Sequence, residues 1–135
     1  YLEEKEVGNA ERGHYVVSLT ENTDTNKKLR EGGIVGEGPT AITLDIFQNN
    51  IEKTLPVDWM NGVSYSNFKL SNGLYATTSI AGVTGYMYDW DGLYRGHSIV
   101  FAHKENIVMI SVTSLTPEDK LLKDFQTIIS SLSLI

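Results

Sequence analysis

The sequence contains no cysteine, which excludes disulfide bonds, thiolate zinc sites and cysteine nucleophiles. It also contains no apolar run near the roughly 20 residues that a membrane-spanning helix requires, and no charged-then-apolar leader. Positive charge is scarce: 11 Lys and Arg stand against 17 Asp and Glu, for a net charge of -6. An electrostatic nucleic-acid binder needs a basic face. We therefore expect no nucleic-acid partner and no membrane insertion by this domain.

What is present describes a single folded domain. A chain of 135 residues suits one domain, and 41% hydrophobic with 21% charged residues is a globular balance. The chain opens at Tyr1 rather than Met. An exported protein without its leader, such as a secreted protein or a lipoprotein with a lipid anchor upstream, would open in this way, and so would a trimmed cytoplasmic domain. We expect an extracellular or cell-envelope location, with the cytoplasm as the alternative.

The first half of the chain predicts two strands and one short helix. Apolar and polar residues alternate over 14–20 and over 40–47, which is typical of strands. Polar residues 1–12 are expected to form a tail, and 21–33 an exposed loop with at most one helical turn around Leu29. A short helix is predicted over 54–60, after the second strand, with Pro56 in its first turn.

The second half predicts five strands joined by hairpins, over 63–70, 74–80, 84–90, 94–103 and 107–113, with turns at 71–73, Gly82, 91–92 and 104–106. Residues 107–113 are apolar on both faces, as in a central strand. A helix is predicted from an N-cap at Thr116, with Pro117 at its first position. Its apolar stripe consists of Leu121, Leu122, Phe125, Ile128, Ile129 and Leu132. The predicted fold class is α/β: an antiparallel sheet of about six or seven strands, with a long C-terminal helix packed on one face and a short helix after the second strand.

This order of elements resembles the PsbP-like fold family. The resemblance is carried by residues 41–47, the short helix ending near Trp59, residues 86–90, residues 99–101, and the capped helix that ends in 129–132; it covers about 40–135. The family includes an oxygen-evolving accessory protein of photosystem II, a Ran-binding import factor and bacterial lipoprotein domains. The resemblance implies one PsbP-like α/β domain over 1–135. The family's usual opening hairpin carries a Pro-x-x-Trp segment that this sequence lacks before Tyr15, so we expect the family's first strand to be absent.

Catalytic and metal-binding patterns are weak. His97 and His103 lie six residues apart on one predicted strand, about 20 Å along it, and cannot bind one metal ion together. Ser98 faces away from His97, which gives no support for a serine triad. Residues 89–92 resemble the start of a calcium loop, but Val100 stands where that loop needs glutamate. Glycine-rich residues 32–38 are followed by Pro39 and a strand, unlike a phosphate-binding loop. We expect no catalytic residue, no metal and no cofactor.

The best candidate for function is an aromatic stripe on the predicted hairpin 84–94. Tyr86, Tyr88 and Trp90 share one strand face, and Tyr94 follows the turn. Such a stripe is either core beneath a helix or a binding surface, because Tyr and Trp combine apolar area with a polar group. The neighbouring acids are expected to form a negative rim that favours a cationic or metal-bridged partner. The candidate binding residues are Tyr86, Tyr88, Asp89, Trp90, Asp91 and Tyr94.

The sequence therefore favours a non-catalytic, exported or envelope-anchored binding or accessory domain. Its ligand is a protein or a small molecule whose identity the sequence leaves open, as it does the oligomeric state. The alternatives are a small hydrolase or other enzyme, and a cytoplasmic protein-binding adaptor of the same fold.

Overall fold

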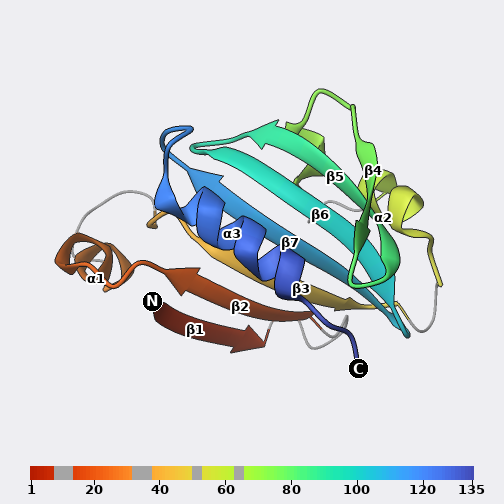
Figure 1. Cartoon of the computed structure of the whole chain (residues 1–135), viewed down its shortest axis with the longest axis horizontal. Helices are drawn as coiled ribbons and strands as arrows, with labels where there is room; N and C mark the ends of the chain where they lie inside the picture. Colours follow the sequence, from red (N-terminus) through yellow and green to blue (C-terminus); the bar gives the residue numbers. More distant parts are fainter. Residues whose placement is uncertain (8–13, 32–37, 50–52, 63–65) are drawn as a thin grey trace.

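The fold is built on one antiparallel sheet of seven strands, ordered β1-β2-β3-β7-β6-β5-β4 (Figure 1). The computed structural model describes residues 1–7, 14–31, 38–49, 53–62 and 66–135. The strands are β1 (Leu2–Val7), β2 (His14–Thr20), β3 (Ile42–Gln48), β4 (Ala76–Ile80), β5 (Val83–Asp91), β6 (Arg95–His103) and β7 (Asn106–Ser114). The helices are α1 (Asp24–Arg30), α2 (Pro56–Gly62), the 3-10 helix η1 (Asn67–Leu70) and α3 (Lys120–Ser131). The predicted α/β class is confirmed, with the C-terminal helix and short helices following the early strands.

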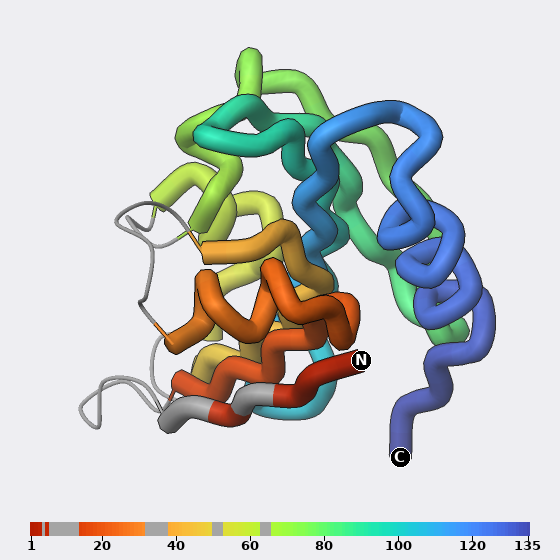
Figure 2. Tube along the Cα trace, turned by 90° about the vertical axis from the view of Figure 1, so that its left-hand side faces the viewer, coloured from red at the N-terminus to blue at the C-terminus, as the bar shows by residue number. Residues whose placement is uncertain are grey.

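The centre of the sheet is β7, which pairs with β3 on one side and β6 on the other. Residues Ile107 to Val112 are all buried, because the side chains on both faces of this strand lie under a covering layer. Figure 2 separates these layers: α3 lies on one side of the sheet, and the segment that holds α2 and η1 lies on the other. The prediction that 107–113 is a central strand covered on both sides is confirmed.

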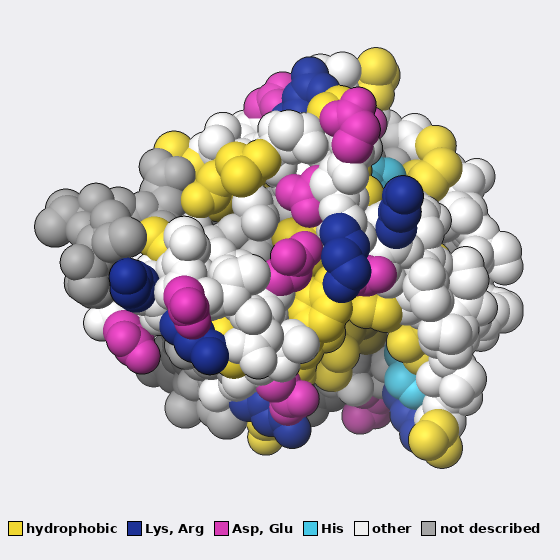
Figure 3. Space-filling view, turned by 60° about the vertical axis from the view of Figure 1, so that its left-hand side comes forward, with side chains coloured by type: hydrophobic (Ala, Val, Ile, Leu, Met, Phe, Trp, Pro, Cys, Tyr) yellow, Lys and Arg dark blue, Asp and Glu magenta, His cyan; other side chains and the backbone are white. Residues whose placement is uncertain are grey.

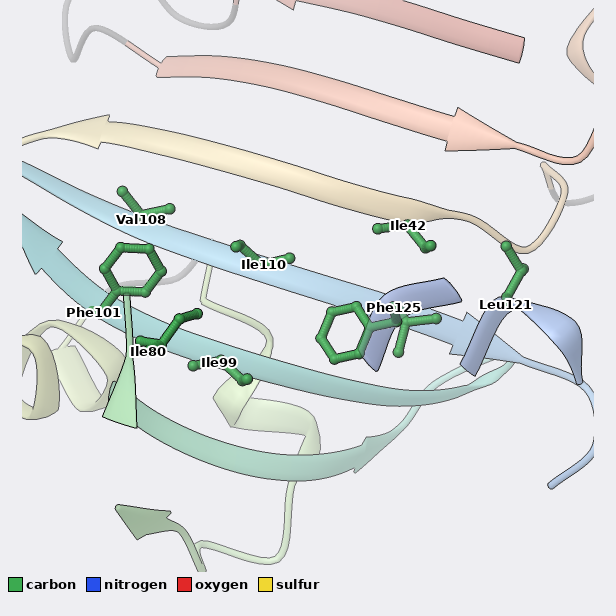
Figure 4. Packing of buried hydrophobic residues seen from close by; sticks show 9 residues of the cluster. Ile42, Ile80, Ile99, Phe101, Val108, Ile110, Leu121 and Phe125 are labelled. Atoms are coloured by element: carbon green, nitrogen blue, oxygen red, sulfur yellow. The ribbon is translucent and has the colours of Figure 1, made fainter. Parts of the chain in front are cut away.

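The core on the α3 side forms around the apolar stripe of that helix. Leu121 and Phe125 are buried against Ile42, Ile99 and Ile110, among other residues of the sheet (Figure 4). The remaining residues of the stripe, Leu122, Ile128, Ile129 and Leu132, are partly buried around them. Helix packing by this stripe was predicted from the three- and four-residue spacing, and it is confirmed.

Cover on this face is uneven. Leu19 on β2 and Leu44 and Ile46 on β3 also pack against the α3-side core but are only partly buried. Figure 3 shows apolar side chains at the floor of a depression, bordered by acidic and basic side chains. The N-terminus links this region to the helix, because the Tyr1 hydroxyl donates to Asp124.

The second core lies under α2 and η1. Its buried members are Phe47, Trp59, Met60, Phe68, Tyr88, Val100, Ile107 and Met109. The predicted short helix is present as α2, and Trp59 and Met60 are its buried residues. The polar side chains of this layer form a hydrogen-bond network that belongs to the candidate site described below.

The start of α3 differs from the prediction. The N-cap is Asp119, not Thr116: its carboxylate accepts from the Leu121 N–H at 3.1 Å. The Asp119 N–H donates to the Thr116 carbonyl at 3.2 Å, so residues 116–119 close a turn before the helix begins. The carboxylate of Asp119, rather than the hydroxyl of Thr116, therefore satisfies a free N–H group of the first turn.

Three other predictions from the sequence differ from the structure. Residues 2–7 are not a tail, because they pair with β2 from Leu2↔Thr20 to Val7↔Tyr15 as an edge strand. Residues 67–70 are not strand but η1, capped by the Ser66 hydroxyl, which accepts from the Phe68 N–H; 63–65 lie outside the described residues. The expected loop over 21–33 holds a full helix, α1, capped by Thr23.

None of the helices within the described ranges is long and apolar enough to cross a bilayer.

Candidate functional site

The outermost hairpin has strands of unequal length. β4 pairs with β5 only from Ala76↔Met87 to Ile80↔Val83, whereas β5 continues to Asp91. On its inner side β5 stays paired with β6 to the end, at Asp91↔Arg95. Over residues 88–91 the outer edge of β5 therefore has no strand partner in the part of the chain that the structure describes. An open strand edge carries backbone N–H and C=O groups that are available for pairing.

A cleft of about 770 Å³ lies at this open edge. One wall is formed by residues Leu70, Ser71, Asn72, Leu74, Tyr75 and Ala76, which lead into β4. The rest is formed by Met87 to Asp91 of β5, Arg95 to His97 of β6, and Ser114, Pro117 and Leu122. Successive residues of a strand point to opposite faces. Because five consecutive β5 residues line the cleft, it reaches the edge of the strand and both of its faces.

Trp90 is the largest aromatic side chain at the cleft, and its position is tightly set. Its indole N–H donates to the Ser98 hydroxyl at 2.9 Å. Its ring lies over Gly96, the residue directly opposite on β6, where a methyl group would lie 2.0 Å from Cε2 of the indole. Only glycine leaves room for the ring at this position. The half-buried indole is therefore held in one place before any ligand arrives.

A chain of hydrogen bonds anchors Ser98 beneath Trp90. The Ser98 and Ser111 hydroxyls are 2.6 Å apart, and both residues are buried. The Asn67 amide donates to the Ser111 hydroxyl at 3.1 Å, and the Tyr88 hydroxyl donates to the Asn67 carbonyl oxygen. Burial raises the pKa of Tyr88 to about 12, so its hydroxyl remains a donor at neutral pH. This network connects η1 to β5, β6 and β7 under the cleft.

The three aromatic residues of the predicted stripe lie on one face of β5 but in different environments. Tyr88 is buried in the core, at 3% exposed, with its ring edge-on to Phe68. Tyr86 is partly buried and does not line the cleft; its ring lies 5.8 Å from that of Tyr75. Tyr94 also lies outside the cleft lining, and its hydroxyl donates to the Gly38 carbonyl at 2.8 Å. Of the aromatic candidates, the cleft brings together Trp90 and the edge of Tyr88.

The two acidic candidates project from the opposite face of β5. Asp89 Oδ1 lies 2.7 Å from His97 Nδ1, and Asp91 is directly opposite Arg95. The Asp89 side chain is nevertheless 90% exposed. Both acids lie beside the cleft, and each has a basic neighbour on β6. The ring of His97 lies edge-on to Phe125 at 5.8 Å, which connects this side of the cleft to α3.

The wall of the cleft between η1 and β4 was not predicted from the sequence. Leu70, Leu74 and Tyr75 are all exposed large hydrophobic residues. Two more, Leu93 and Leu115, lie at the same end of the molecule, in the β5–β6 turn and just after β7. The prediction placed 63–70 and 74–80 on paired strands, which hid this wall. The sequence carries no local signal for it, because it depends on where the pairing of β4 with β5 stops, at Ala76↔Met87.

The remaining histidines lie away from the cleft. His14 stacks on Phe47 at 4.1 Å, and its Nε2 lies 2.9 Å from Asp45 on the face under α2. His103 Nε2 lies 3.1 Å from the Ile135 carbonyl at the C-terminal end. Over the residues that the structure describes, no three His, Asp or Glu side chains gather closely enough to hold a metal ion. Of the glycine-rich stretch 32–38, only Gly38 is among the described residues.

Comparison of the chain with models of protein families, with curated proteins and with solved structures found no match.

Proposed function

We propose that this chain is a non-catalytic binding or accessory domain, and that the cleft at the open edge of β5 is its binding site. The observation that carries the proposal is the preset position of Trp90, held by Ser98 and Gly96 at the edge of a cleft of about 770 Å³. Binding sites in this size range combine apolar lining with a few fixed polar groups. A rigid aromatic side chain gives large contact area at low entropic cost.

The surroundings of Trp90 support the same proposal. Leu70, Leu74 and Tyr75 expose apolar surface on one wall, and contiguous exposed apolar surface marks interaction sites in soluble proteins. Asp89, His97 and Arg95 add charged or titratable groups on the other side. This combination of an apolar centre with a polar border is typical of a recognition surface.

The family and the location belong to the proposal as well. The PsbP-like resemblance is supported by the order of the elements, with a short helix after β3 and a C-terminal helix on the sheet. We propose an exported or envelope-anchored protein from the sequence considerations above. The reading frame upstream of Tyr1 tests this: a leader with a lipobox cysteine supports a lipoprotein, and a cytoplasmic domain fused upstream contradicts it.

The binding site is tested with Trp90 as its own reporter. The chain has two tryptophans, so the variant Trp59→Phe leaves Trp90 as the only indole. We expect ligands from a panel of heptapeptides and small aromatic or aliphatic compounds to shift its emission. Isothermal titration calorimetry should then show that Trp90→Ala and Leu74→Ser lose at least about tenfold in affinity, or about 1.4 kcal/mol.

The matched control is Leu55→Ser. Leu55 is as exposed as Leu74, at 68% against 70%, but it does not line the cleft. It should leave the affinity unchanged. If every ligand of the panel binds Trp90→Ala and Leu74→Ser as tightly as the unaltered chain, the cleft is not the binding site. A catalytic turnover of any panel compound would instead favour the enzyme alternative.

A further inference from the structure

We infer that the occupant of the cleft is an extended peptide segment that adds to the sheet as an eighth strand, antiparallel to β5 and paired with Asp89 and Asp91. This inference rests on the proposed function, which it deepens by naming the class of ligand. It is carried by the direction of the β5 backbone groups, by the residues that line the cleft, and by the charges beside it.

The turn between β4 and β5 sets the direction of the backbone groups. Ala81 and Gly82 form a two-residue turn with φ angles of 50° and 82°, flanked by the pair Ile80↔Val83. In such a hairpin the flanking pair exchanges both of its backbone hydrogen bonds, and every second pair after it does the same. Val83, Gly85 and Met87 therefore direct their N–H and C=O groups toward β4.

The same alternation in the direction of the backbone N–H and C=O groups continues along β5 beyond the last residue that pairs with β4. The pairing of β5 with β6 is continuous from Gly85↔Phe101 to Asp91↔Arg95, with no bulge. Asp89 and Asp91 therefore direct their N–H and C=O groups outward, where β4 has ended. Among the described residues no backbone hydrogen bond fills these positions. Four backbone groups in strand geometry thus lie at the cleft, and an extended peptide is the ligand that satisfies them.

The lining of the cleft indicates the side chains that such a peptide would carry. A residue paired with Asp89 or Asp91 shares the face of those acids, and opposite charges across a strand pair are favourable. The residue between them faces the side of Trp90, where Leu70 adds apolar surface. The peptide is therefore basic–apolar–basic over three residues. His97 and Arg95 also face the acids from β6, but the Asp89 carboxylate is 90% exposed and open to a partner on the outer side.

A second copy of this chain fits the edge less well than such a peptide. Two β5 edges paired about a twofold axis would bring Asp89 and Asp91 of one copy against the same acids of the other. Like charges directly opposite each other on paired strands are destabilising. A basic peptide has the complementary charge and meets no such repulsion.

The test begins with selection of heptapeptides from a displayed random library on the folded chain. We expect enrichment of the basic–apolar–basic pattern. In a selected peptide, N-methylation of the two basic residues removes the N–H groups that would donate to Asp89 and Asp91. This should reduce the affinity at least about tenfold. N-methylation of the central apolar residue is the matched control, because its N–H faces away from β5, and it should have little effect.

Variants of the protein test the same backbone hydrogen bonds by changing Asp89 instead of the peptide. Asp89→Pro removes the outward N–H, and proline is tolerated at edge positions whose N–H has no partner. Asp89→Ala keeps the N–H and removes only the carboxylate. We expect a far larger loss of peptide affinity for Asp89→Pro than for Asp89→Ala, with folding of both confirmed by circular dichroism. If Asp89→Pro does not fold, the N-methylated peptides still decide the question on the unaltered chain.

Failure of this inference is distinguishable from failure of the proposed function. If no peptide is enriched, or if methylation at the basic and central positions has equal effects, strand addition is wrong. The proposed function then still stands if small compounds shift Trp90 emission and depend on Leu74. If Trp90→Ala and Leu74→Ser leave the affinity for peptides and for small compounds unchanged, the strand-addition inference and the proposed function are both wrong.

Discussion

Trp90 and Gly96 lie directly opposite each other on β5 and β6, and the indole ring of Trp90 occupies the space that any side chain at Gly96 would need. This relationship orients the ring toward Ser98, which accepts its N–H. The position of the main aromatic group at the cleft thus depends on the absence of one Cβ atom on the neighbouring strand.

Gly96→Ala should displace Trp90. A methyl group 2.0 Å from Cε2 cannot be accommodated without movement of the ring, and overpacking of this kind costs about 1–3 kcal/mol. In a Trp59→Phe background we expect a red shift of Trp90 emission and a lower free energy of unfolding in urea. Gly62→Ala is the control, because a Cβ there meets nothing within 4 Å. An unchanged emission maximum in Gly96→Ala would contradict the packing described.

Phe125→Ala should lower the free energy of unfolding by about 3–5 kcal/mol, because the ring is 1% exposed at the centre of the α3-side core. Chemical denaturation measures this loss. Gln126→Ala, on the exposed side of the same helix, should cost less than about 0.5 kcal/mol. A loss of unfolding free energy below about 1 kcal/mol for Phe125→Ala would contradict the packing of α3 on the sheet.

The position of the helix cap is separately testable. Asp119→Ala removes the carboxylate that accepts from the Leu121 N–H and should cost about 1 kcal/mol. Thr116→Ala, at the cap predicted from the sequence, should be close to neutral, because the exposed Thr116 contributes its carbonyl rather than its side chain. Equal losses of stability in the two variants, measured by thermal unfolding, would contradict the assignment of Asp119 as the N-cap.

Asp45 should make stability depend on pH in the acidic range. Burial raises the pKa of Asp45 above its ordinary value of 3.8, and the hydrogen bond with His14 opposes that rise in part. A raised pKa favours the protonated form in the folded state, so its contribution to stability is full below pH 3.8 and is lost as pH rises through the raised value.

Asp45→Asn cannot titrate and should not lose this stability. The free energy of unfolding of the variant, relative to the unaltered chain, should therefore increase between about pH 3 and pH 6 in urea titrations. Asp58→Asn is the control, because Asp58 is exposed. If the relative stability of Asp45→Asn falls over this range, the carboxylate is stabilised in the fold rather than penalised by burial.

The sequence by itself determined the elements whose patterns are local. The spacing of Leu121, Phe125 and Ile128 predicted α3. Alternation over 40–47 predicted β3, and a run that is apolar on both faces over 107–113 predicted the central strand β7. Each pattern repeats with the period of its own backbone, so it is visible without knowledge of any partner. The placement of Tyr86, Tyr88 and Trp90 on one face of β5 followed from the same alternation.

The tertiary structure alone decided the ends of the sheet and the site. Residues 2–7 join the sheet through backbone pairing, which needs no apolar side chain and leaves no mark in composition. The cleft exists because β4 pairs with β5 only as far as Met87, four residues before β5 ends, and because Leu70, Leu74 and Tyr75 form a wall beside the unpaired edge. Where two strands stop pairing depends on everything packed around them, so Asp89 and Trp90 were predictable as candidates, but the open edge that unites them with Leu70 and Leu74 was not.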